Sequence, residues 1–363
     1  MSATVAASPL PGDDHLLLLS LVATVALQLA CFGVAWTLQV DLLTDLAGSA
    51  NFVLLALLSF FLGQAGGDNG GGGGGPSRAL VITALVCLCR LELAAFLLYR
   101  VCRRGHDARF DAMRARFLPF LFFWVFQMVW VWVVCLPCVV VNADLPAAAA
   151  PPLFAPQGRA AACDAAGLAM FAAGFAVEAA ADLQKDRFRR DPANRGRVCA
   201  EGLWRYSRHP NFFGEMLLWW GIFVLSLPAL DASPARWGYA AAAASPLLTM
   251  VLLLFVSGMP TAEGNNQLRF MRGADARARY EAYRWRTSPI VPLPNALYAA
   301  TPLAVKRWLL LELSMYEATD EAAAALQPLG GGGGAGGGGG GVGGGGEGGG
   351  DAGEGTKGVA EFR

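Results

Sequence analysis

The sequence contains few charged residues for its length. Of its 363 residues, 15% are charged and 55% are hydrophobic, whereas soluble domains carry roughly 25% charged residues. The mean hydropathy is +0.43. This composition excludes an ordinary soluble domain and indicates a membrane protein with several spans. The formal net charge is +0, so the overall charge gives no reason to expect a nucleic-acid partner.

The N-terminal part of the sequence lacks positive charge, because no lysine or arginine precedes Arg78. Signal peptides and transit peptides need early positive charge. We therefore expect a polar N-terminal tail over 1–15 and a retained membrane span after it.

Histidine is scarce and cysteine is scattered. The sequence has three histidines and eight cysteines, and most of the cysteines lie in or beside apolar runs, where cysteine behaves as a small hydrophobe. Cys87 and Cys89 are only two residues apart, and Cys135 and Cys138 have no histidine near them. We expect neither a disulfide framework nor a metal site.

Seven apolar runs are each about as long as the 20 residues that a membrane helix needs. They cover 16–38, 42–63, 79–101, 117–141, 163–183, 211–230 and 237–259. A glycine tract at 70–75 lies between the second and third runs, a polar segment covers 261–316, and a glycine-rich tail covers 317–363. The glycine tracts formally contain GxGxxG, but neither lies between a strand and a helix, so a dinucleotide-binding Rossmann unit is rejected. The predicted fold is an all-α bundle of seven transmembrane helices.

The arginines indicate how the bundle is oriented. They cluster after the third run, between the fifth and sixth runs, and after the seventh run. With seven spans these three segments fall on one side of the membrane, and the sparsely charged connections fall on the other. The positive-inside rule then predicts an outside or lumenal N-terminus and a cytoplasmic C-terminus.

Several ionisable residues lie inside or at the edge of the apolar runs. The third run contains Arg90 and Glu92, the fifth ends with Glu178 and Asp182, and the sixth contains Glu215. Such residues are costly in lipid and usually mark a functional site.

Polar and aromatic residues gather just before Glu215, in the stretch GLWRYSRHPNFFGE at 202–215. Arginine suits phosphate recognition, and a helix N-terminus favours a bound anion. A phosphorylated cofactor is therefore a reasonable ligand. A purely topological role for arginine is the alternative, and we prefer it only for the arginines between the third and fourth runs.

The same stretch resembles a known family. GLWRYSRHPNFFGE, preceded by ADLQKDRFRRDPANRGR and followed by SGMPTAEGNNQ and YEAYRWRTSPIVPLP, is similar to the membrane family related to steroid 5-alpha reductase, in its branch with the steroid-reductase C-terminal domain. The resemblance covers about residues 89–316. It implies NADPH held at the cytoplasmic side, in an endoplasmic reticulum or other endomembrane. The implied cofactor-binding residues are Glu178, Asp182, Arg189, Arg197, Tyr206, Arg208, His209, Asn211 and Glu215.

The reaction implied by the resemblance is reduction of a carbon–carbon double bond conjugated to a carbonyl in a lipophilic molecule. The steroid enzymes carry a glutamate in their second span, whereas the second span here has only Asp45. Arg90 and Glu92 in the third span are the catalytic candidates instead.

Two other functions remain open at this point. Isoprenylcysteine carboxyl methyltransferases share the RHPxYxGE pattern and bind S-adenosylmethionine. A transporter is the non-enzymatic alternative, but its polar residues would be expected to recur through several spans, with a repeat in the helices.

Overall fold

The computed structural model describes residues 13, 15–40, 42–65, 77–104, 111–144, 153–154, 157–233, 236–270 and 274–316. Within these ranges the chain is helical and has no strand, apart from one isolated bridge between Ser207 and Ser288. Seven helices are long and apolar enough to cross a membrane, which confirms the predicted all-α bundle. The glycine tract at 70–75, the tail at 317–363 and most of the N-terminal tail lie outside the described residues.

The helices include long spans and shorter segments between or after them. In chain order they are α1 (Leu17–Leu38), α2 (Leu42–Ala65), α3 (Arg78–Arg104), α4 (Asp111–Arg114), α5 (Phe117–Asp144), α6 (Arg159–Arg190), α7 (Pro210–Ala232), α8 (Trp237–Val251), α9 (Met259–Phe270), α10 (Ala274–Arg286), α11 (Asn295–Ala300) and α12 (Leu303–Trp308). A π-helical segment, Leu252–Val256, joins α8 to α9. Short 3-10 turns cover Pro192–Asn194, Gly202–Arg205 and Ser314–Tyr316.

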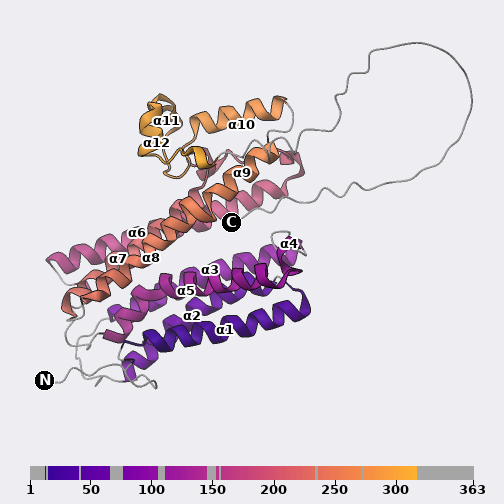
Figure 1. Ribbon diagram of the computed structural model, residues 1–363. Helices are drawn as coiled ribbons and strands as arrows, with labels where there is room; N and C mark the ends of the chain where they lie inside the picture. Colours follow the sequence, from indigo (N-terminus) through magenta and orange to yellow (C-terminus); the bar gives the residue numbers. More distant parts are fainter. Residues whose placement is uncertain are drawn as a thin grey trace, which may run out of the picture.

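The spanning helices form two groups. Figure 1 shows α1, α2, α3 and α5 together, with α6, α7, α8 and α9 beside them and α10, α11 and α12 outside the second group. The main apolar core joins the two groups, since Phe52 of α2 and Val131 of α5 belong to the same cluster as Leu218 and Trp219 of α7. Trp219 is fully buried, and its ring centroid lies 5.6 Å from that of Phe52.

Glycines set the distance between α6 and α7. These helices run antiparallel, with Gly167 of α6 against Gly221 of α7, and Gly174 against Gly214. A Cβ built on Gly214 would lie 2.6 Å from the backbone oxygen of Gly174 and 2.6 Å from the backbone nitrogen of Glu178. Close backbone packing through small residues is typical of membrane helices. It brings the acidic end of α6 directly against the start of α7.

Two helices differ from their expected spans. The fifth span was expected at 163–183, but α6 runs from Arg159 to Arg190 and so continues through residues expected in a connection. The seventh was expected to end at 259, but helical structure continues through the π-helical segment and α9 to Phe270. Apolar length marks the part of a helix that lies in lipid, and a helix does not have to stop where its apolar run ends.

The arginine-rich segments lie at one end of the bundle. The Arg190 side chain, at the end of α6, donates a hydrogen bond of 3.3 Å to the hydroxyl of Tyr99 near the end of α3. Figure 1 places α4 and the end of α9 at this same end. We call it the basic end.

Candidate functional site

The site is assembled where two segments meet beside the start of α7. The backbone N–H groups of Arg208 and His209 donate to the carbonyls of Ser288 and Pro289, at 2.8 and 3.1 Å. The Ser207 hydroxyl donates to the Ile290 carbonyl at 2.7 Å. His209 is the N-cap of α7 and Pro210 is its first residue, a position where proline costs no backbone hydrogen bond. These contacts fix the two side chains before the helix begins.

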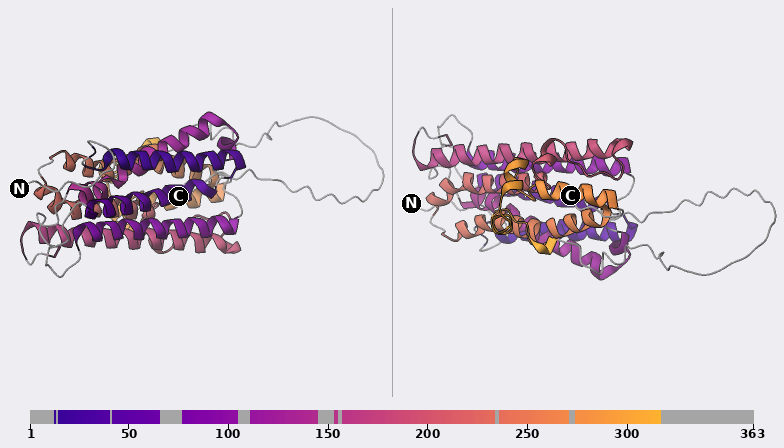
Figure 2. Two further views of the ribbon diagram at one scale, coloured as in Figure 1. Left: turned by 90° about the horizontal axis from the view of Figure 1, so that it is seen from below. Right: turned by 90° about the horizontal axis from the view of Figure 1, so that it is seen from above.

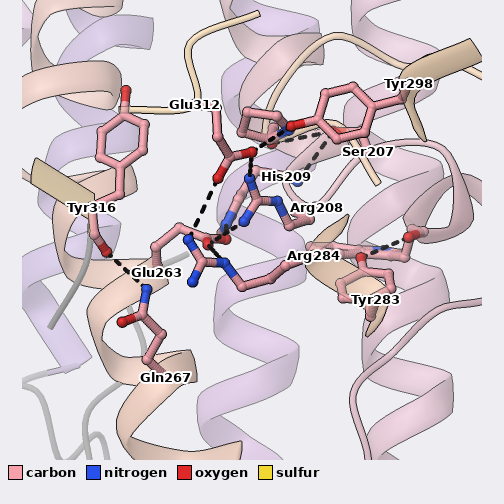
Figure 3. Close-up of polar contacts among 12 residues, drawn as sticks. Ser207, Arg208, His209, Glu263, Gln267, Tyr283, Arg284, Tyr298, Glu312 and Tyr316 are labelled. Carbon is pink, nitrogen blue, oxygen red and sulfur yellow. Dashed lines mark hydrogen bonds and ion pairs between the residues drawn. The ribbon is translucent and has the colours of Figure 1, made fainter. Parts of the chain in front are cut away.

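Arg208 lies at the centre of a buried ion-pair network (Figure 3). Its Nη1 donates to Oε2 of Glu263 at 2.8 Å, and its Nη2 donates to Oε2 of Glu312. His209 Nε2 lies 2.6 Å from the other oxygen of Glu263. Two carboxylates from distant parts of the sequence therefore pair with one guanidinium, as a buried charge requires.

Two further side chains complete the network around Glu312. Arg284 Nη2 donates to Oε1 of Glu312 at 3.4 Å, and the Tyr298 hydroxyl donates to Oε2 of the same residue. Burial, followed by the negative charge of Glu312, raises the pKa of Tyr298, so its hydroxyl stays protonated and can donate. The network thus ties α7, α9, α10 and α11 to the chain after α12.

The π-helical segment positions the acidic partner of this network. Backbone N–H groups of Ser257 and Gly258 both donate to the Leu252 carbonyl, at 2.9 and 3.2 Å. A Cβ on Gly258 would clash with the Leu253 carbonyl oxygen, so the turn needs glycine there. Such π-bulges occur frequently at functional sites. Here the bulge lies just before α9, the helix that carries Glu263 to Arg208 and His209.

A second charged group lies deeper in the bundle. Arg90 of α3 is fully buried, and its Nη1 lies 3.4 Å from Oε1 of Glu215 on α7. Its guanidinium carbon lies 5.3 Å from the Phe52 ring and 5.2 Å from the Trp219 ring. Glu178 of α6 is also buried and interacts electrostatically with Arg90. Among the described residues, Nε and Nη2 of Arg90 have no hydrogen-bond acceptor.

The two charged groups lie at different depths along α7. Glu215 follows His209 by six residues, which corresponds to about 9 Å along a helix at 1.5 Å per residue. The outer group, around Arg208, lies at the basic end, and the inner group, around Arg90, lies within the spans.

A cavity of about 510 Å³ opens beside the outer group. Four arginines line it, from the connection after α6 and from α10: Arg197, Arg205, Arg279 and Arg286. Its other lining side chains are aromatic, polar or small, and no carboxylate lines it within the part of the chain that the structure describes. Ligand cavities commonly measure 300–1,000 Å³. The cavity therefore has the size and the positive charge for an anionic ligand.

Two tyrosines of the cavity wall link it to the site. Burial raises the pKa of both Tyr280 and Tyr283, so their hydroxyls stay neutral near pH 7. The Tyr283 hydroxyl donates to the Trp204 carbonyl at 2.7 Å, and the Tyr280 ring lies 5.4 Å from that of Phe270. The indole of Trp204 in turn donates to the Ala181 carbonyl at 2.9 Å. The cavity wall is thus anchored to the end of α6.

The structure brings together most, but not all, of the residues expected in the site. Arg208 and His209 lie in the outer group, and Arg90, Glu178 and Glu215 lie in the inner group. Arg197 lines the cavity.

The remaining expected residues have separate positions. Asp182 and Asn211 are buried near the facing ends of α6 and α7, and Asn211 Oδ1 has no hydrogen-bond partner among the described residues. Tyr206 is exposed, and Arg189 is half-buried in the last turn of α6. Glu92 is half-buried, and its position two residues from Arg90 turns it to a different face of α3.

Sequence reasoning missed several residues of the site. Glu263 and Glu312 were not singled out, although they hold Arg208. Arg279 and Arg286 were noted only as members of an arginine-rich segment. The available signal was an acid inside the stretch SGMPTAEGNNQ, which follows the seventh apolar run and was used for the resemblance alone.

The chain also matches a protein-family model. The family model described as "Protein of unknown function (DUF1295)" matches residues 31–287. The chain belongs to this family. The match includes the Arg90, Arg208 and Glu263 positions, whereas Tyr298 and Glu312 lie beyond it. No curated protein matches the chain, and no solved structure does.

Proposed function

We propose that this DUF1295 protein is a membrane-embedded reductase that uses NADPH to reduce a conjugated carbon–carbon double bond in a lipophilic enone. The observation that supports it most is the arginine-lined cavity at the basic end of the bundle. NADPH carries several phosphate oxygens, and arginine binds such oxygens with paired hydrogen bonds. S-adenosylmethionine has no phosphate, so four arginines without a carboxylate suit it poorly.

The residues present fit the cofactor in three respects. Arg197, Arg205, Arg279 and Arg286 would neutralise its phosphates, and the rings of Tyr280 and Tyr283 offer stacking. Asn211, which does not line the cavity, has a buried oxygen that a ligand donor reaching the start of α7 would satisfy. Arg208 and His209 would support this site by holding the surrounding segments in place, since Nη1 and Nη2 of Arg208 and Nε2 of His209 are engaged by carboxylates.

The inner group would serve the substrate. NADPH, when bound, would supply a hydride for the β-carbon of the enone. Arg90 would use Nε and Nη2, which lack acceptors among the described residues, to donate to the carbonyl oxygen as negative charge develops there. Glu215 would hold the guanidinium in place, and the rings of Phe52 and Trp219 would form an apolar wall. A proton at the α-carbon completes the reduction.

The proposed setting follows from the seven spans. The substrate would enter from the bilayer, and the basic end would face the cytoplasm, following the positive-inside rule. The endoplasmic reticulum or another endomembrane is the location that the resemblance implies.

The proposal can be tested by calorimetric titration of the purified protein in nanodiscs with NADPH and, separately, with S-adenosylmethionine. We expect NADPH to bind and Arg286→Gln to weaken it about tenfold or more, since a charge-assisted hydrogen bond contributes about 1.5–3 kcal/mol. Arg277→Gln is the matched control, because Arg277 is an exposed α10 arginine that pairs with Glu281 and is not in the cavity wall.

Three results would contradict the proposal. Binding of S-adenosylmethionine by the folded protein would favour the methyltransferase alternative. Binding of neither ligand would remove the cavity as a cofactor site. Equal losses of NADPH affinity in Arg286→Gln and Arg277→Gln would point to general charge attraction instead of a specific site.

A further inference from the structure

The segment around α12 has large apolar side chains on its exposed surface and a buried lysine. Trp308 is 86% exposed, Leu309 72% and Leu303 53%, whereas Lys306 of the same helix is buried. Lys306 Nζ lies 4.3 Å from the ring centroid of Trp285. A surface that faced water would show the opposite arrangement, because lysine is rarely buried and clusters of large apolar side chains are rarely exposed.

This segment lies against the flank of the spanning helices. Leu311 and Leu313, which follow α12, belong to an apolar cluster with Phe212 and Met216 of α7. The same cluster includes Met250 and Leu253, near the junction of α8 and the π-helical segment. Figure 1 shows α11 and α12 beside this second group of helices, and the right-hand view of Figure 2 shows α10–α12 in front of it. Residues after α12 thus reach the level of the apolar spans.

We propose that the surface formed by Leu297, Leu303, Trp308 and Leu309 rests on the lipid bilayer at the level of the headgroups. We call it the α12 surface. Tryptophan is enriched at membrane interfaces because its ring is apolar and its N–H is polar. The neighbouring Arg307 is exposed and suits anionic headgroups. The seven spans place a bilayer around the bundle that this segment packs against.

Lys306 keeps the α12 surface in this orientation. Its Nζ donates to the Trp285 carbonyl at 3.4 Å and also lies 4.3 Å from the Tyr298 ring centroid. Tyr298 is held by Glu312 in the ion-pair network. The ion-pair network of the site, through Tyr298 and Lys306, therefore holds the protein-facing side of the α12 surface in place.

Membrane contact would also affect the arginine-lined cavity. Arg286 and Asn295 line the cavity. Arg286 directly follows Trp285, and Asn295 is the first residue of α11, the helix that carries Leu297. Resting the α12 surface on lipid would hold these two wall residues close to the membrane surface. The inference about bilayer contact itself does not depend on the proposed reductase activity.

The test uses a fluorescent NBD label at Leu309→Cys in nanodiscs that hold one full-length chain each. The exposed native Cys102 is replaced by serine, and the labelled parent without Leu309→Cys gives the background from the remaining cysteines. The control position is Arg277→Cys on the exposed face of α10. Nitroxide-bearing lipids, with the nitroxide near the headgroup, serve as the quencher.

We expect blue-shifted emission at position 309 and lipid quenching several times stronger than at position 277. Equal, weak quenching at both positions would overturn the proposal, because the α12 surface would then face water. Blue-shifted emission at 309 without lipid quenching would also overturn it, because protein would then cover the surface. If the covering protein is a second copy of this chain, lipid quenching at position 309 should fall when each nanodisc holds two chains instead of one.

Discussion

Arg208 joins two acidic residues that are far from it in sequence. Glu263 and Glu312 lie 55 and 104 residues away, and Arg208 and Glu263 are almost fully buried. Replacing Arg208 with alanine leaves two carboxylates without their shared guanidinium. We expect Arg208→Ala to lower the free energy of unfolding by about 3 kcal/mol or more, since breaking a buried pair costs about 3–5 kcal/mol. Denaturant unfolding in detergent measures this change.

An exposed ion pair provides the control for Arg208→Ala. Arg277 and Glu281 form an i, i+4 pair on the surface of α10, and such pairs contribute about 0.3–0.5 kcal/mol. Arg277→Ala should therefore leave the unfolding midpoint almost unchanged. Similar losses in both variants would show that the buried network does not hold the segments together.

We expect the free energy of unfolding to depend on pH because His209 is buried. Burial lowers the pKa of His209 below its usual value, although its hydrogen bond to Glu263 acts in the opposite direction. The unfolded chain therefore binds this proton more readily than the folded chain does. Stability from this group is complete above about pH 6.5, the unfolded value, and is lost as the pH falls through the lower folded value.

The measurement compares wild type with His209→Gln, whose amide can still donate to Glu263. We expect the wild-type unfolding temperature to fall more steeply than that of the variant as the pH drops below about 6.5. Glu263, Arg208 and Lys185 also act on His209 and are present in both proteins. Parallel curves would mean that His209 takes no part in the pH response.

At the residue scale the sequence identified the unusual side chains but not all of their partners. Arg90 and Glu215 were identified because a charge inside an apolar run needs an explanation, and the structure pairs them. Glu263 was not, because its partner Arg208 comes from another helix end. No local pattern in a sequence shows which distant charge will be adjacent.

At the element scale α6 and α7 depend on their glycines. We expect Gly214→Ala to destabilise the protein by about 1–3 kcal/mol, as overpacking usually does, because the new Cβ would meet Glu178 N and Gly174 O at 2.6 Å. The variant should also disturb the inner group, since Glu178 and Glu215 flank the contact. Denaturant unfolding in detergent measures the loss.

Gly33 of α1 is the matched control for Gly214→Ala. A Cβ at Gly33 would meet nothing within 4 Å, and alanine has a better helix propensity than glycine. Gly33→Ala should be neutral or slightly stabilising. If Gly214→Ala were equally well tolerated, close glycine packing would not be what holds α6 against α7.

Helix number and helix length differed in how well the sequence predicted them. The seven spans were predictable because a chain in lipid must satisfy its backbone hydrogen bonds within apolar helices of sufficient length. The continuation of α6 to Arg190 and the π-helical segment before α9 were not predicted. Both occur at the ends of apolar runs, where side-chain contacts with other segments decide whether the helix continues.

At the scale of the whole molecule the orientation in the membrane remains a prediction. Cys102 is exposed near the end of α3, at the basic end, and Arg159 is exposed at the start of α6, at the opposite end. In sealed vesicles with the cytoplasmic face outward, a membrane-impermeant maleimide should label Cys102. In the same vesicles it should fail to label Arg159→Cys in a Cys102→Ser background.

Permeabilised vesicles provide the control for accessibility, since both positions should then react. Labelling of Arg159→Cys but not Cys102 in the sealed vesicles would reverse the predicted orientation. The arginine-rich segments would then face the lumen, away from cytoplasmic NADPH, and the proposed cofactor site would lose its support.

The sequence alone determined that this chain is a seven-helix membrane bundle with its arginine-rich segments at one end. Hydropathy and charge are local properties, and the bilayer selects helices and their direction from local composition. Only the tertiary structure decided that Arg208 lies between Glu263 and Glu312, and that four arginines share one cavity. Those arrangements depend on the glycine contact between α6 and α7, the π-helical turn before α9 and the return of the chain after α12, which join residues distant in sequence.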